Sequence, residues 1–163
     1  MSKSAFMTPE LVGEAVRLVT PAIHEIIKLD PKRNAIYIYV FGPLADDLDQ
    51  PVWQGAVGEQ DRSKWAKDYS KPALAKAAVS LRTGLPSHMV QREYAHLYVN
   101  GDFKYGGSEV RKGIIVAASG LAWHHDYAVS AMLAGAIDGL VKGKFDAEYA
   151  RKTLFIGEPE PTT

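Results

Sequence analysis

The pattern of hydrophobic and polar positions predicts three helices, near the start, in the middle and near the end of the chain. Apolar residues recur at helical spacing in residues 11–26, 74–81 and 129–141. Thr8 suits an N-cap and Pro9 a first helical position, so we expect the first helix to begin there. Pro21 interrupts the first pattern and is expected to kink or restart that helix.

Between these helices, residues 35–41 form the strongest predicted strand. Its aliphatic residues alternate with aromatic ones, which puts Ile36, Ile38 and Val40 on one face and Tyr37, Tyr39 and Phe41 on the other. Both faces are therefore apolar or aromatic. A strand covered on both sides, or covered on one side and lining a pocket on the other, explains this pattern.

Shorter patterns predict further strands, at residues 52–57, 95–100, 103–105 and 114–118. Asn100-Gly101 is typical of a tight turn between two antiparallel strands. Strands linked by hairpins, with helices before and after them, predict an α+β fold with an antiparallel sheet rather than a doubly wound parallel one. We expect one domain over residues 1–163, with a disordered tail at 158–163.

The composition narrows the range of partners. Nineteen basic and nineteen acidic residues give a formal net charge of zero. This argues against nucleic acid, which requires a surplus of Lys and Arg on one face. The chain has no cysteine, which fits a reducing cytoplasm. Residues 1–9 lack the apolar core of a signal peptide, and no run approaches the ~18 apolar residues of a membrane span. We expect a cytoplasmic protein.

Eight tyrosines and three tryptophans make aromatic surfaces a candidate binding feature. If residues 95–100 are a strand, Tyr94, His96 and Tyr98 share one face of the sheet. Such a row suits a flat aromatic ligand or plain cross-strand packing. Tyr37 and Tyr39 offer a second candidate ligand surface on the first strand.

The adjacent pair His124 and His125 stands at the predicted start of the last helix. Adjacent helical residues point about 100° apart, so the two rings are not expected to bind one metal together. The positive end of the helix favours the neutral imidazole, the form required of a metal ligand or a general base. The alternative is that one ring packs at the helix start and the other is solvated.

Several familiar chemistries have no matching motif in this chain. The Gly106-Gly107 loop lacks both a phosphate-loop Lys and a dinucleotide fingerprint. Ser119 lacks the Gly-x-Ser-x-Gly context of an esterase, and the acidic residues at 46–49 lack the rest of a calcium loop. No catalytic residue is predicted, and the sequence leaves open whether the protein is an enzyme.

One group of motifs nevertheless resembles a known family. Gly106-Gly107 precedes a buried strand that ends at Ser119-Gly120, and Asp126 follows near the start of an Ala-rich helix. Together with the Ala/Lys-rich segment around Lys76, this order resembles the GlcG/HbpS-like family. The resemblance implies a five-stranded antiparallel sheet with helices packed on its faces, in a three-layer arrangement similar to profilin and PAS-like domains. It also implies a homo-oligomer, and several members of the family are linked to haem binding or degradation.

The resemblance also implies candidate site residues. Gly106 and Gly107 would border a ligand pocket, and His88 follows a small-residue loop that matches the family's. By a looser analogy with a histidine on the first helix, His24 is a candidate haem-iron ligand; a half-buried histidine at a helix end is the alternative. Ser108-Glu109-Val110 departs from the family, which often has Pro two residues after the glycine pair.

Three functions remain open from the sequence. The first is a small oligomeric binding protein for haem, another tetrapyrrole or a small planar organic molecule. The second is a small enzyme that uses a histidine and a tyrosine as an acid–base pair on an organic substrate. The third is a non-catalytic accessory subunit, for which we expect a large exposed apolar patch.

Overall fold

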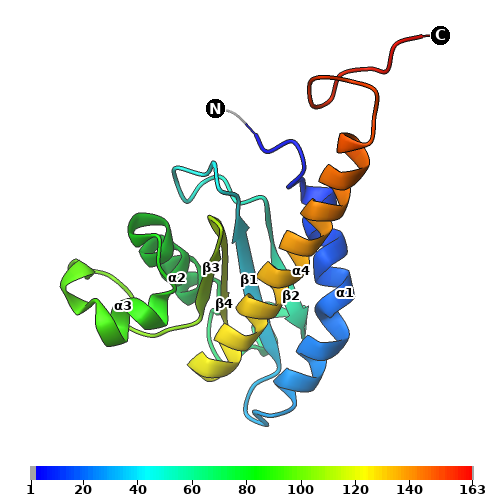
Figure 1. Ribbon diagram of the computed structural model, residues 1–163. Coiled ribbons are helices and arrows are strands. Elements are labelled where there is room, and N and C mark those ends of the chain that lie inside the picture. Colours follow the sequence, from blue (N-terminus) through cyan, green and yellow to red (C-terminus); the bar gives the residue numbers. More distant parts are fainter. Residues whose placement is uncertain (1–2, 163) are drawn as a thin grey trace.

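The computed structural model describes residues 3–162, and this part of the chain folds into one sheet flanked by helices (Figure 1). The elements are, in order, α1 (Pro9–Ile27), β1 (Ala35–Phe41), β2 (Trp53–Gly58), α2 (Ser70–Thr83), α3 (Ser87–Glu93), β3 (Ser108–Arg111), β4 (Ile114–Ser119) and α4 (Trp123–Tyr149), with short 3₁₀ turns at Arg62–Lys64 and Ala95–Leu97.

The sheet has four strands in the order β2-β1-β4-β3, and every neighbouring pair is antiparallel. β1 lies in the centre, where Ile38 pairs with Gly55 of β2 on one side and with Ala118 of β4 on the other. The predicted α+β class with an antiparallel sheet is therefore confirmed, while the predicted fifth strand is wrong for the described residues.

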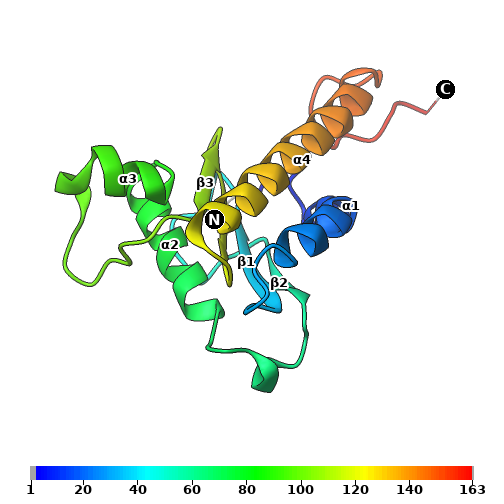
Figure 2. The ribbon, with the colours of Figure 1, turned by 90° about the horizontal axis from the view of Figure 1, so that it is seen from below.

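Helices cover both faces of this sheet, as Figure 2 shows. The aliphatic face of β1, with Ile36, Ile38 and Val40, is buried in a cluster with residues of α1 and α4. On the other face, Phe41 packs against Ala77 of α2. The alternation along β1 therefore reflects a strand covered on both sides, one of the two arrangements that its sequence predicts.

The first helix begins where the sequence predicts. The Thr8 hydroxyl oxygen accepts a hydrogen bond from the backbone N–H of Leu11 at 3.2 Å, and Pro9 occupies the first turn. Pro21 lies inside a helix that continues from Pro9 to Ile27, so the helix does not restart there. Packing of the apolar face against α4 and the sheet compensates for the one backbone hydrogen bond that Pro21 cannot donate.

The strands predicted at residues 95–100 and 103–105 are wrong. Ala95–Leu97 is a 3₁₀ turn that follows α3, and the predicted turn at Asn100-Gly101 is present without flanking strands. Arg82 of α2 explains the difference, because its guanidinium donates to the Asp102 carboxylate at 3.0 Å and to the Leu97 carbonyl at 3.1 Å. These bonds tie the segment to a helix and not to a sheet edge.

The outer strand β3 is instead Ser108–Arg111, where the pattern predicts no strand. A two-residue turn at Lys112-Gly113 joins it to β4, and both turn residues have positive φ, 51° and 82°. Such a turn suits the twist of antiparallel strands, and glycine adopts it without strain. Arg111 consequently pairs with Ile114 across the hairpin.

Two of the predictions from the sequence concern the ends of the chain, where the structure does not describe every residue. Met1, Ser2 and Thr163 lie outside the described residues, so the signal-peptide and tail predictions are covered only in part. Disorder of the tail at 158–163 stays a prediction. Within residues 3–162, every helix is too short or too polar to cross a membrane.

Leu133 offers a direct test of the core between α4 and the sheet. Its side chain is fully buried, so Leu133→Ala removes apolar contacts and leaves a cavity. We expect the free energy of unfolding to fall by about 2–5 kcal/mol in urea denaturation. Leu18→Ala is the matched control, because Leu18 is half exposed on α1, and we expect a change within about 0.5 kcal/mol. Equal losses in the two variants would contradict this description of the core.

Candidate functional site

A buried ion pair joins α2 to α4 across the end of β4. The Lys76 Nζ lies 2.8 Å from Oδ2 of Asp126, and both side chains are only 2% exposed. Nζ also donates to the Ala118 carbonyl at 2.9 Å. The second carboxylate oxygen, Oδ1, accepts from the Leu121 backbone N–H at 2.9 Å. Backbone groups of β4 and of the turn between β4 and α4 thus hold the two charges in place.

Gly107 allows this pair to form, because its backbone lies directly against both charged groups. A Cβ atom at this position would lie 2.6 Å from the Lys76 Nζ and 3.0 Å from the Asp126 Cβ, and its φ is 138°. The Gly107 carbonyl accepts from the Ser130 hydroxyl at 2.6 Å, which fixes the loop on α4. A side chain at this position would displace the Lys76 ammonium from the pair, and the positive φ would be strained for any residue but glycine.

Desolvation dominates the electrostatics of the pair. Burial raises the pKa of Asp126 from its ordinary value of 3.8 to about 6, although Lys76 acts in the opposite direction. Burial likewise lowers the pKa of Lys76 below its ordinary value, against the attraction of Asp126. Each charge is costly in this environment without the other, so the two side chains depend on remaining in contact.

A second group of side chains lies next to the ion pair, where α3 meets the start of α4. We call His88, Arg92, Trp123 and Tyr127 the His88 cluster. The ring centroid of His88 is 4.3 Å from that of Tyr127 and 6.0 Å from that of Trp123. The Arg92 guanidinium lies over the Trp123 ring at 4.8 Å. The cluster therefore combines three flat rings with one positive charge.

The glycine pair connects the two groups. A Cβ atom at Gly106 would lie 2.6 Å from the Cβ of His88 and 3.0 Å from the Trp123 ring, while Gly107 lies against the ion pair. One dipeptide therefore lies against the His88 cluster with its first residue and against Lys76 and Asp126 with its second.

His88 has unsatisfied hydrogen-bonding capacity. Its Nδ1 is buried and has no hydrogen-bond partner among residues 3–162, and the same holds for Nδ1 of His125. Burial lowers the pKa of the His88 imidazole, which favours the neutral ring. A neutral imidazole offers one donor and one acceptor nitrogen, and a buried polar atom without a partner is costly. The half-buried His88 ring thus holds a buried nitrogen that has no partner in the described part of the chain.

Tyr127 is held in place by a neighbouring strand. Its hydroxyl donates to Oε2 of Glu109 in β3 at 3.0 Å. Burial, and next the hydrogen bond to Glu109, raise the pKa of Tyr127 above its ordinary value. The hydroxyl therefore stays protonated at neutral pH, and the ring is fixed beside His88.

The structure brings some of the sequence-predicted site residues to this region. Gly106 and Gly107 lie against both groups, as described above. His124 and His125 begin α4 with ring centroids 4.3 Å apart, and the His124 ring is 5.8 Å from that of Trp123. His124 is exposed and His125 is half-buried, so only His125 has a buried nitrogen.

Other predicted site residues lie elsewhere. Tyr37 is buried in the sheet, where its hydroxyl donates to the Gln54 side chain at 3.0 Å and its ring packs against Trp65. Tyr39 stacks on Phe41 on the same face. These tyrosines contribute to the packing between β1 and α2.

The predicted row of Tyr94, His96 and Tyr98 does not form, because these residues lie in and around a 3₁₀ turn and not on a strand. The Tyr94 and His96 rings are 6.1 Å apart, and the Tyr98 hydroxyl donates to the Lys104 carbonyl at 3.3 Å. Each of the three side chains thus has a local partner, and the flat aromatic surface that a strand would present is missing.

His24 is exposed near the end of α1, away from α3 (Figures 1 and 2). Its role as an iron ligand stays a prediction. Within residues 3–162, no three of the histidine, aspartate and glutamate side chains are close enough to one another to hold a metal ion.

Sequence reasoning mentioned Lys76, His88 and Asp126 but did not assign them to a common site. A signal for Lys76 was present, because this charge shares a helix face with Ala73, Ala77 and Ser80, all of which are buried. A charged residue on an apolar helix face requires a buried partner. Trp123 and Tyr127 had no comparable signal, since aromatic residues at a helix start suit packing equally well.

The fold and this site define an α+β protein in which a buried Lys–Asp pair and a histidine–aromatic cluster meet at a glycine pair. No family model and no curated protein matches the sequence. The crystal structure of the yeast Ybr137w protein, which has a GlcG/HbpS-like fold, matches with a TM-score of 0.56 and 17% identity, over 85% of this chain and 81% of that chain. The similarity concerns the fold, and it agrees with the resemblance found in the sequence.

The ion pair can be tested by a double-mutant cycle. Lys76→Met leaves Asp126 buried without a counter-charge, so we expect the free energy of unfolding to fall by about 3–5 kcal/mol. The double variant Lys76→Met/Asp126→Leu removes both charges and should recover most of this loss. Arg17→Met is the control, because it breaks an exposed pair with Glu14 and should have no measurable effect. A double variant as unstable as Lys76→Met would contradict the proposed coupling.

The raised pKa of Asp126 predicts a pH dependence of stability. The folded protein binds the carboxyl proton more tightly than the unfolded chain does. This contribution to stability is therefore complete below about pH 3.8 and is lost as the pH rises through about 6. We expect the stability difference between wild type and Asp126→Asn to decrease over that window in urea denaturation.

Asp138→Asn is a control for the same measurement, because the stability contribution of Asp138 should change with pH in the opposite direction. A hydrogen bond from Arg111 holds the pKa of Asp138 at about 2, so its contribution is present above pH 3.8 and is lost as the pH falls toward 2. The difference in free energy of unfolding between wild type and Asp126→Asn is the quantity that decides. If it stays constant between about pH 4 and pH 7, Asp126 is not buried as described.

Proposed function

We propose that this protein binds a small planar organic molecule that carries a carboxylate, and that the His88 cluster holds it. The observation that carries the proposal is the surroundings of the half-buried His88 ring: the Trp123 and Tyr127 rings and the Arg92 guanidinium lie together there, and the His88 Nδ1 has no partner among the described residues. Aromatic walls with a few polar groups are typical of sites for organic ligands.

Each group of the cluster has a distinct part in this binding. Trp123 and Tyr127 offer flat apolar surfaces for a planar molecule, and the neutral imidazole of His88 supplies a hydrogen bond at its edge. Arg92 supplies the positive charge that a carboxylate requires. Gly106 brings the chain backbone close to the rings, because it has no side chain in the way.

Haem belongs to the same chemical class, because it is planar and carries carboxylates. The donor chemistry fits, since a neutral histidine is a common haem-iron ligand and partial burial favours the neutral form of His88. When bound, haem would add the redox and ligand-binding chemistry of its iron. The residues of this chain would bind and orient the tetrapyrrole: Arg92 would supply a charge for its carboxylates, and Trp123 and Tyr127 would supply apolar ring surface.

A second candidate function, an enzyme with a histidine–tyrosine acid–base pair, is favoured by one specific contact. His88 and Tyr127 lie ring to ring, and Glu109 accepts the hydrogen bond of the Tyr127 hydroxyl. A neutral imidazole can accept a proton, and a tyrosine held by a carboxylate can exchange one. Tyr127→Phe distinguishes the two functions, because it would abolish turnover and leave the binding of a planar ligand in place.

The binding proposal is tested by titration with two related probes, haemin and metal-free protoporphyrin IX. We expect both to quench tryptophan fluorescence saturably, because Trp123 lies in the site. His88→Phe keeps a ring but removes both nitrogens, so we expect it to weaken binding at least tenfold. His96→Phe is the matched control, since His96 is an exposed histidine outside the cluster, and we expect it to bind like wild type.

The pair of probes also separates planar recognition from iron ligation. Equal loss of both probes in His88→Phe supports a hydrogen bond to the organic part of the ligand. If His88→Phe loses the haemin Soret shift but still binds protoporphyrin IX, His88 is supported as the iron ligand. If His24→Ala loses the Soret shift and His88→Phe keeps it, the haem site lies on α1. Failure of both probes to bind, or equal binding to all variants, would overturn the proposed site.

A further inference from the structure

The end of α4 and the segment after it form an exposed apolar arm. Five of the ten large hydrophobic side chains that are exposed in the described chain lie between residues 145 and 156, namely Phe145, Tyr149, Leu154, Phe155 and Ile156. The exposed fraction reaches 92% at Leu154 and 73% at Phe155. Figure 1 shows this arm projecting beyond the sheet and the other helices. Such a concentration of apolar surface marks a contact with another molecule.

The tip of the arm is ordered by polar contacts and is not a loose tail. We call Leu154-Phe155-Ile156 the knob. The backbone N–H groups of Leu154 and Phe155 point to the Glu158 carboxylate at 3.3 and 3.2 Å. Arg151 donates to the Glu158 carbonyl at 2.7 Å and pairs with Glu148. These bonds bend the chain back on itself and present the three apolar side chains outward, so little ordering entropy would be lost on docking.

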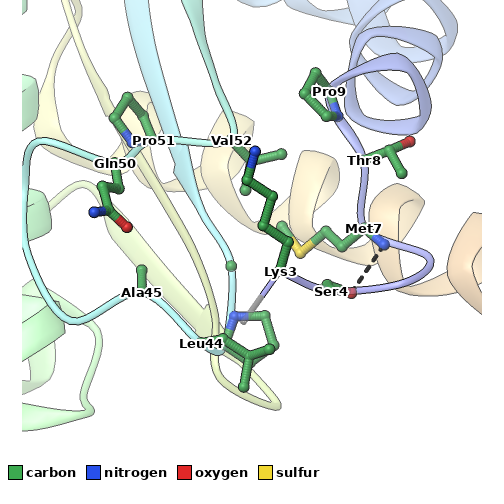
Figure 3. Close-up of a pocket in the computed structure, with 12 residues that line it drawn as sticks. Lys3, Ser4, Met7, Thr8, Pro9, Leu44, Ala45, Gln50, Pro51 and Val52 are labelled. Atoms are coloured by element: carbon green, nitrogen blue, oxygen red, sulfur yellow. Dashed lines mark hydrogen bonds between the residues drawn. The ribbon is translucent and has the colours of Figure 1, made fainter. Parts of the chain in front are cut away.

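The same chain carries a groove of matching character at a different place. A cavity of about 470 Å³ lies between the segment before α1 and the loop from β1 to β2 (Figure 3). Its lining is largely apolar, with Met7, Pro43, Leu44, Pro51 and Val52, and Lys3 is the charged residue in it. The residues of the His88 cluster do not line it, so it is separate from the proposed ligand site.

Size and charge favour the knob as the occupant of this groove. The knob offers about 15 side-chain carbon atoms, which is within the range that a pocket of several hundred Å³ encloses. Leu44, at the rim of the groove, is itself 51% exposed and would gain cover. Glu160 follows the knob; its carboxylate lies 3.7 Å from Arg151, and the side chain is 55% exposed, which leaves surface for a contact with Lys3 of a second copy. Asp46, Asp47 and Asp49 belong to the same loop but do not line the groove.

We propose that the knob of one chain docks into the Met7–Leu44–Val52 groove of a second copy of this chain. The knob does not reach the groove of its own chain, because the Glu148, Arg151 and Glu158 contacts hold it away from the body. Since knob and groove are different surfaces, every chain has one of each. The contact closes either reciprocally in a two-fold dimer or head to tail around a ring.

Assembly is measured first, on the full chain without ligand, by sedimentation equilibrium. We expect wild type at a multiple of the 17.8 kDa chain mass, and Phe155→Glu and Leu44→Glu at 17.8 kDa. Leu18→Glu is the matched control, because Leu18 and Leu44 are both 51% exposed, and we expect it to assemble like wild type. A monomeric wild type, or dissociation by only one of the two test variants, would overturn the proposal.

Crosslinking then tests which surfaces meet, and the absence of native cysteine makes this simple. We expect a disulfide-linked dimer when Phe155→Cys and Leu44→Cys proteins are mixed under oxidation, and none from either protein alone or from mixtures with Leu18→Cys. A dimer of Phe155→Cys with itself would show a knob-to-knob contact and overturn the proposal. A double variant, Phe155→Cys/Leu44→Cys, tests contact within one chain. A disulfide inside a single chain of this variant would show that the arm folds back on its own groove, and would overturn the proposal.

Discussion

The buried contact between Lys76 and Asp126 is the interaction on which the rest of the site depends. It joins a helix on one face of the sheet to a helix on the other, at the end of the strand that lies between them. Neither charge is stable there alone, because burial shifts the pKa of each side chain toward its neutral form. The pair therefore holds α2 and α4 in one relative position, and that position sets where Gly107 and its neighbours lie.

The two-sided sheet provides the framework in which such a pair can be buried. β1 directs aliphatic side chains toward α1 and α4 and aromatic ones toward α2, so both of its faces are excluded from water. The Lys76 ammonium consequently lies in an interior of low polarizability, where its hydrogen bonds to Ala118 and Asp126 are strong and their loss is costly. On α3, partial burial lowers the pKa of His88 and favours its neutral form, which is the form that can bind a ligand group.

The helix α4 connects the two proposed activities of the molecule. Its first turns carry Trp123, His125, Asp126 and Tyr127, which build the ion pair and the proposed ligand site. Its last turns carry Phe145 and Tyr149 and lead into the exposed knob. Because a helix is stiff along its axis, the site and the arm keep a fixed separation. Ligand binding and assembly can therefore be measured independently, although one element supports both.

The sequence by itself determined the elements with a clear local period: α1, α2 and α4, the central strands β1 and β4, and hence an α+β fold with an antiparallel sheet. Those patterns are local, since helical and strand spacing repeat within a few residues. Only the tertiary structure decided that Ser108–Arg111, and not residues 95–105, forms the outer strand, because Arg82 holds the latter segment on α2. Only the tertiary structure paired Lys76 with Asp126, which are 50 positions apart, and placed His88 against Tyr127. Contacts between distant residues leave no period in a single sequence. The glycine pair Gly106-Gly107 could therefore suggest a site, but it could not identify the other residues that form it.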